Sequence, residues 1–166
     1  MRNATYLVFA LLALLLASCQ YLISQPKFRL ALHLVVSEAE KDNANSSLIV
    51  KARAIDGSNS CMIRGFPMID SRHILKMDVL RNDDGRNAAL KIYFDDFAAG
   101  LWSEVTSLGD KPKVAVIVDG FVSGFMELPQ ALEDGVILVT PHIWSLAEAR
   151  LIAENAKRNY RIINKR

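Results

Sequence analysis

The feature that most constrains the fold is a pair of apolar runs joined by Asp119-Gly120. Residues 113–118 read Lys-Val-Ala-Val-Ile-Val, and residues 121–128 are again mostly apolar. Asp-Gly in this setting is a strong hairpin signal, because glycine adopts the positive φ of a tight turn without steric penalty. The first run is apolar at every position after its lysine, which is typical of a strand covered on both faces. The sequence therefore predicts a central β-hairpin over residues 113–127.

Strand and helix patterns flank this hairpin. Leu90, Ile92 and Phe94 alternate and predict a strand over 88–94 with these side chains inward. A helix is expected over 96–108, with Asp95 or Asp96 as N-cap and Gly109 as C-cap. The apolar stripe of this helix is predicted to comprise Phe97, Leu101, Val105 and Leu108.

After the hairpin, a strand is predicted over 136–140 and a helix over 145–159. Ser145 and Glu148 form a capping-box pattern at the start of that helix. The order strand, helix, hairpin, strand, helix predicts an α+β fold of split βαβ type. Its expected architecture is a mostly antiparallel sheet with two main helices packed on one face.

The N-terminal half predicts additional strands. Residues 28–36 and 48–55 alternate, and the polar segment 38–47 joins them, so we expect these two strands to pair antiparallel. An extended piece is expected over 61–67, and a single helical turn over 69–74. His33 lies on the more polar face of the first strand and is expected at the surface.

Residues 1–18 predict an export signal, because a basic start is followed by an unbroken apolar run from Tyr6 to Ala17. That run is shorter than the roughly 20 apolar residues of a membrane span. Leu16-Ala17-Ser18-Cys19 resembles the lipobox of bacterial lipoproteins. The resemblance implies cleavage before Cys19, diacylglycerol on its sulfur and an acyl chain on its amino terminus. Gln20 in place of the aspartate used for inner-membrane retention implies the outer membrane, facing the periplasm. An ordinary secretory signal or an uncleaved anchor is the alternative.

The rest of the chain is divided into a lipidated tether (19–26), one α+β domain (27–160) and a basic tail (161–166), with a helix continuing to Ile163 as an alternative.

The net charge of +2, without a basic stripe, does not indicate nucleic-acid binding. With Cys19 acylated, Cys61 has no partner in the chain. It is interpreted as a small buried apolar side chain, or as a redox or intermolecular disulfide residue.

No constellation in the sequence predicts catalysis, a metal or a cofactor. His33, His73 and His142 lack ligand spacing, and phosphate-loop and nucleophile-elbow motifs are absent. The adjacent carboxylates at 83–84 and 95–96 are interpreted as turn and capping residues, and Trp102 and Trp144 as core. An enzyme whose site joins His142, Asp119 and Ser123 remains an alternative hypothesis.

Roughly residues 60–160 resemble the head of the first periplasmic domain of SecD, a subunit of the bacterial protein-export machinery. The matching stretches are Ile69–Ile74, Leu80–Gly85, Leu90–Phe94, Val114–Gly120, Gly135–Val139 and Trp144–Ala149. The proline that SecD carries shortly after the Asp-Gly turn is displaced here to Pro129, and no multi-span region follows.

The resemblance implies a stand-alone head-like domain that handles protein rather than catalysing a reaction. We therefore expect a non-enzymatic, lipid-anchored binding protein with a protein partner in the envelope. An exposed sheet edge is one way to recruit a partner strand. An envelope hydrolase and a structural envelope lipoprotein remain the alternatives.

Overall fold

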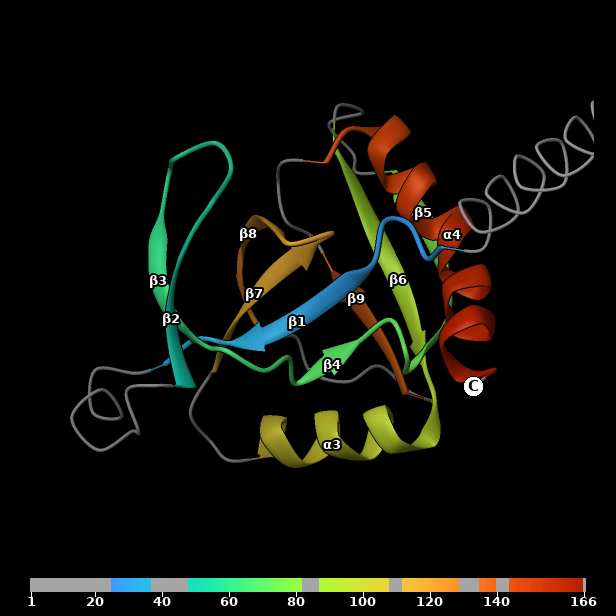
Figure 1. The fold of residues 1–166 in the computed structure, drawn as a ribbon, viewed down its shortest axis with the longest axis horizontal. Coiled ribbons are helices and arrows are strands. Elements are labelled where there is room, and N and C mark those ends of the chain that lie inside the picture. The colour runs from blue at the N-terminus through green and yellow to red at the C-terminus, as the bar shows by residue number, and fades with distance from the viewer. Residues whose placement is uncertain are drawn as a thin grey trace, which may run out of the picture.

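The computed structural model is α+β, with mostly antiparallel sheets and two helices in the described residues (Figure 1). It describes residues 25–36, 48–81, 87–107, 112–128, 135–139 and 144–165. The strands are β1 (Leu30–Leu34), β2 (Ile49–Arg53), β3 (Ser60–Arg64), β4 (Ile69–Asp70), β5 (Ile74–Arg81), β6 (Ala88–Phe94), β7 (Lys113–Val118), β8 (Phe121–Glu127) and β9 (Val136–Val139). The helices are α3 (Asp96–Ser107) and α4 (Leu146–Asn164). This confirms the predicted fold class.

The Asp-Gly hairpin forms as predicted and lies inside a four-stranded sheet of order β4-β1-β7-β8. Asp119 and Gly120 have φ of 48° and 87°, the left-handed values that this tight turn requires. One face of β7 places Val114 and Val116 in the main core. On the other face, Ala115 packs against residues of β2 and β3, so β7 is covered on both sides as its sequence predicts.

A second, three-stranded sheet of order β5-β6-β9 meets helix α4. Leu90 and Ile92 of β6 are fully buried, whereas Lys76 of β5 and Tyr93 of β6 make a cation–π contact away from the core. α4 lies along β5 and β6 and buries a face that includes Ala149, Ile152 and Ala156 (Figure 1). The Ser145–Glu148 capping box at its start is present as predicted.

The pairing of the N-terminal strands differs from the prediction. β1 pairs with β7 and β4, while β2 pairs with β3 in a separate two-stranded sheet. The predicted antiparallel pairing of residues 28–36 with 48–55 is therefore wrong. Beside β7, Leu30 and Leu32 lie fully buried in the main core together with Val114 and Val116, whereas three of the five residues of β2 are exposed.

Two local predictions are also corrected. Residues 69–74 are not a helical turn but β4 followed by a tight turn, in which the Asp70 carboxylate accepts a hydrogen bond from the backbone N–H of Arg72. In α3, Phe97 is 64% exposed, and the buried residues are Ala98 and Trp102. The predicted N-cap Asp95 is confirmed, because its carboxylate accepts from the N–H of Ala98.

The last helix is longer than predicted. α4 continues to Asn164, so the segment 161–166 begins as helix, as the alternative interpretation held. Several predicted features lie outside the described residues: the signal and Cys19, the whole 38–47 segment, the turn at 82–86, Leu108 with Gly109, and Pro129.

Candidate functional site

An apolar groove of about 550 Å³ is the best candidate for a binding site. It lies where the end of β1, the start of β2, the segment between β3 and β4, and helix α3 come together. Its lining residues are Leu34, Val36, Leu48, Ile49, Arg64, Phe66, Pro67, Met68, Leu101 and Val105. Nine of these ten side chains are apolar, so the groove favours an apolar ligand.

Backbone hydrogen bonds on both sides of Phe66 hold this residue at the rim of the groove. The N–H of Gly65 donates to the carbonyl of Leu48 over 2.7 Å, and the N–H of Met68 donates to the carbonyl of Leu32 over 2.8 Å. The chain is therefore fixed on both sides of the Phe66-Pro67 pair. A Cβ on Gly65 would lie only 3.3 Å from the Leu48 carbonyl oxygen, so glycine permits this close approach.

The rim of the groove exposes large apolar side chains. Phe66 is 73% exposed and Leu48 is 48% exposed. Burying a phenylalanine side chain contributes about 1.5–3 kcal/mol, which the isolated domain forgoes at this position. An apolar groove with exposed apolar residues on its rim is the usual mark of a surface that binds another molecule.

A larger cavity, of about 760 Å³, lies between the β7–β8 turn, β1 and the end of α4. Its charged residues Arg29, Asp70, Arg72 and Asp119 are already paired with one another. Burial would raise the pKa of Asp70, but the hydrogen bonds and charge of Arg72 outweigh it, so the pKa of Asp70 lies below its ordinary value. The charged groups here are satisfied within the domain, and we assign them a structural role.

Of the three residues in the catalytic alternative, Asp119 and Ser123 are described, and both have structural roles. The carboxylate of Asp119 accepts hydrogen bonds from the backbone N–H groups of Phe28 (2.7 Å) and Arg29 (2.9 Å), which fasten the start of β1 to the hairpin turn. Ser123 is buried in β8, with 7% of its surface exposed. His142 lies outside the described residues.

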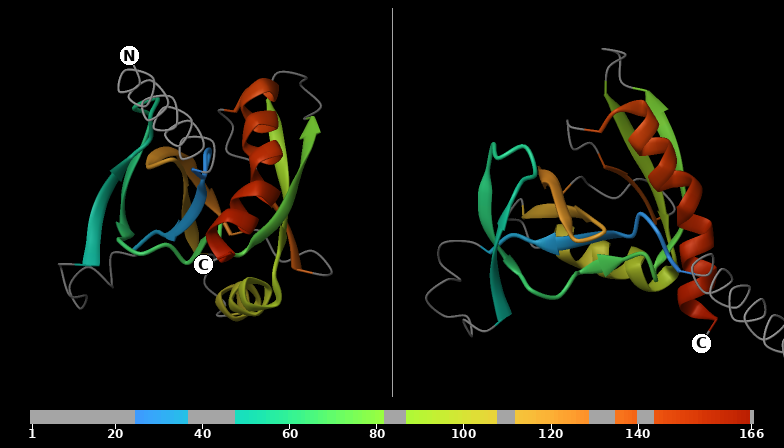
Figure 2. Two further views of the ribbon diagram at one scale, coloured as in Figure 1. Left: turned by 45° about the vertical axis from the view of Figure 1, so that its right-hand side comes forward. Right: turned by 45° about the horizontal axis from the view of Figure 1, so that its top comes forward.

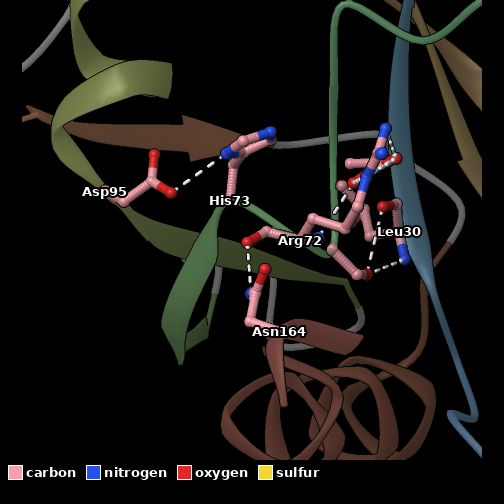
Figure 3. A network of polar contacts seen from close by, with 7 residues as sticks. Leu30, Arg72, His73, Asp95 and Asn164 are labelled. Carbon is pink, nitrogen blue, oxygen red and sulfur yellow. Dashed lines mark hydrogen bonds and ion pairs between the residues drawn. The ribbon is translucent and has the colours of Figure 1, made fainter. Parts of the chain in front are cut away.

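The remaining histidines and cysteines named in the sequence analysis show no sign of a catalytic or metal site in the described residues. His33 is 9% exposed, and its ring donates to the backbone carbonyl of Arg64, so the predicted surface position is wrong. His73 contacts the Asp95 carboxylate at 3.0 Å (Figure 3). Cys61 is half-buried in β3 with a free thiol. Cys19 lies outside the described residues, so its acylation stays a prediction.

Trp102 and Trp144 are buried in the main core, as predicted. Within the described ranges, no three His, Cys, Asp or Glu side chains gather where a metal ion could bind. Neither helix of this part of the chain is long and apolar enough to cross a membrane.

Sequence reasoning did not find the groove. Its residues come from four segments that are distant in the chain, and none of them forms a motif. The one local signal is Gly-Phe-Pro at 65–67, since an aromatic residue held between glycine and proline is placed outside regular structure.

Comparison with known proteins adds a relationship of fold. No protein-family model matches the chain, and no curated protein matches it significantly. A solved structure of SecDF, described as a membrane component that enhances protein export, matches with a TM-score of 0.55 and 18% identity over 86% of this chain and 67% of that one. A second, of SecDF in a super-membrane-facing form, matches with a TM-score of 0.51 and 17% identity over 85% of this chain and 20% of that one.

At this level of identity the likeness concerns the fold alone. The predicted resemblance to SecD is thus supported at the level of structure, over more of the chain than the matching sequence stretches cover. The described domain has a SecD-like fold.

Proposed function

We propose that this chain is a non-enzymatic, lipid-anchored protein of the bacterial envelope, held at the outer membrane through acylated Cys19 and facing the periplasm. Its SecD-like domain binds a protein partner, and the groove beside Phe66 holds an apolar segment of that partner. The observation that carries the proposal is the apolar groove itself, with Phe66 73% exposed on its rim.

The chemistry of the groove favours a polypeptide ligand. A chain with apolar side chains buries them against Leu34, Met68 and Val105, which line the groove. The segment 38–47 of this chain is an unsuitable occupant, because its sequence is polar and contains no large apolar side chain. SecDF is described as enhancing protein export, and this analogy of fold supports the proposal that the partner is a protein of the envelope.

Two exposed phenylalanines offer a matched test. Phe66 is 73% exposed and lines the groove, whereas Phe121 is 65% exposed at the start of β8 and does not line it. Full-length tagged protein carrying Phe66→Ser or Phe121→Ser is recovered from envelope extracts in mild detergent, beside the unchanged protein. Co-purifying proteins are identified by mass spectrometry.

We expect one defined partner with the unchanged protein and with Phe121→Ser. Loss of a phenylalanine contact of about 2 kcal/mol lowers the affinity roughly 30-fold, so Phe66→Ser recovers little of this partner. Equal recovery with all three proteins would exclude the groove as the binding site. Failure to recover any partner would remove the support for a binding function.

A further inference from the structure

The exposed face of α4 carries a row of cations. The helix itself contains four basic residues, Arg150, Lys157, Arg158 and Arg161, and two acidic ones, Glu148 and Glu154. The C-cap Lys165 adds a fifth cation. Counted from the first of them, the basic residues lie at i, i+7, i+8, i+11 and i+15, a spacing that places them on one side of a helix. That side is opposite the buried face, which contains Ala156 and Asn159.

The acidic residues do not neutralise this row. Glu148 is engaged in the capping box with Ser145, which leaves Glu154 as the acid among the cations. No ion pair involving the five basic residues is found among the described residues that surround them. We name these five residues the cationic face of α4.

The N-terminal segment joins the domain beside this helix. The side chain of Asn159, which is fully buried, accepts from the N–H of Lys27 and donates to its carbonyl. At the last residue of α4, the side chain of Asn164 donates to the backbone carbonyl of Arg72 and fixes the end of the helix (Figure 3). Lys27, which is itself exposed, adds a cation next to α4.

Chain length limits how far the domain can lie from a membrane that holds the N-terminal segment. The predicted apolar run ends at Ala17, and Gln25 is the first described residue. An extended chain spans no more than about 3.6 Å per residue. The eight residue-to-residue steps from Ala17 to Gln25 therefore span at most about 29 Å, and the six steps from Cys19 to Gln25 at most about 22 Å. A membrane that holds the N-terminal segment therefore lies close to Lys27 and to the part of α4 around Asn159, which binds Lys27.

We propose that the cationic face of α4 binds the anionic phospholipid headgroups of the membrane that anchors the chain. Juxtamembrane cations contribute about 1 kcal/mol each on an anionic surface, which is about fivefold in affinity per residue. The β2–β3 sheet lies at the opposite side of the domain from α4, so this orientation turns the groove side away from the membrane (Figure 2). The proposal rests on the membrane anchoring of the proposed function but not on its protein partner.

The test uses lysine acetylation of the full-length protein reconstituted into vesicles. Flotation with neutral phosphatidylcholine vesicles first establishes anchoring, independently of headgroup charge. Acetylation of Lys27, Lys157 and Lys165 is then compared between neutral vesicles and vesicles containing phosphatidylglycerol, with the exposed Lys51 and Lys113 as internal controls. We expect the first three to react about fivefold more slowly in anionic vesicles at low salt, and to regain their reactivity at high salt.

A pair of charge-matched variants completes the test. Arg158→Gln with Arg161→Gln removes two cations from the cationic face, and Lys51→Gln with Arg53→Gln removes two from the exposed side of β2. The first pair is expected to abolish most of the protection of Lys157 and Lys165, and the second to leave it unchanged.

Equal reactivity in neutral and anionic vesicles overturns the proposal, even if a variant fails to fold. Equal protection by soluble glycerol phosphate also overturns it, because the face would then be a site for a small phosphate. Failure of flotation in neutral vesicles contradicts the anchoring of the proposed function instead.

Discussion

The pair of hydrogen bonds between the Asn159 side chain and the Lys27 backbone, here called the clamp, predicts a large loss of folding stability in Asn159→Ala. Asn159 is fully buried, and its side chain makes hydrogen bonds of 3.1 Å and 2.7 Å to the N–H and carbonyl of Lys27. Asn159→Ala leaves both backbone groups without their partner, at about 1–3 kcal/mol for each group that stays dry. Because Lys27 is exposed and water reaches part of this site, we expect a total loss of about 2–3 kcal/mol in the free energy of unfolding.

The loss is measured by urea unfolding and by thermal melting of the full-length protein. At about 2–4 °C per kcal/mol for a chain of this size, the melting temperature falls by roughly 4–12 °C. The urea midpoint falls while the slope stays constant, since the surface exposed on unfolding hardly changes. Asn159→Asp is expected to cost more at neutral pH, because a carboxylate cannot donate to the Lys27 carbonyl and is buried as a charge.

Asn155→Ala is the matched control in the same helix. Within the described residues, Asn155 donates to the Leu151 carbonyl one turn earlier, and alanine is the better helix former. Its free energy of unfolding should change by no more than about 0.5 kcal/mol. Equal effects of Asn159→Ala and Asn155→Ala would refute the reasoning that the clamp stabilises the domain.

Three further predictions concern glycine, the hairpin turn and acid stability. Gly135→Ala should lower the free energy of unfolding, measured in urea, by about 1–3 kcal/mol, because Gly135 has a φ of 68° and an added Cβ would lie 2.8 Å from the Cβ of Ala99. Gly100→Ala should raise it by up to about 1 kcal/mol, because a Cβ at this helical position meets open space. Changes of the same sign in both variants would contradict this prediction. Asp119→Ala should cost about 1–2 kcal/mol by the same measurement through its two lost backbone hydrogen bonds, and an unchanged midpoint would count against the fastening of β1 to the hairpin. Because the pKa of Asp70 is lowered, its ionisation stabilises the fold above the unfolded pKa of about 3.9, and this contribution is lost as the pH falls through the lower folded pKa. Asp70→Asn should therefore flatten the acid side of a profile of urea midpoint against pH, and superimposable profiles would refute it.

Local patterns were sufficient to predict much of the second half of the chain. The Asp119-Gly120 turn and the Ser145–Glu148 capping box are each specified by a few adjacent residues, and both form as predicted. The alternation of Leu90, Ile92 and Phe94 likewise gave the inward face of β6 correctly. In each case one chemical requirement is met within a short stretch of sequence.

The errors arose where distant segments decide the outcome. Residues 28–36 and 48–55 alternate alike, and only the three-dimensional arrangement selects β7 rather than β2 as the partner of β1. Phe97 fits an apolar stripe by spacing, but it lies in the first turn of α3, where its ring is 4.9 Å from that of His73 at the surface. The groove depends on four such segments at once, which is why periodicity did not reveal it.

Photocrosslinking in living cells tests the central claim most directly. A photoreactive phenylalanine analogue replaces Phe66 in the groove or Phe121 at the hairpin, residues of similar exposure in the same full-length protein. The account predicts crosslinks from position 66 to one defined envelope protein, and far fewer from position 121. Crosslinks from both positions alike, from position 66 only to a second copy of this chain, or none from position 66 would contradict the proposal that the groove binds a protein partner.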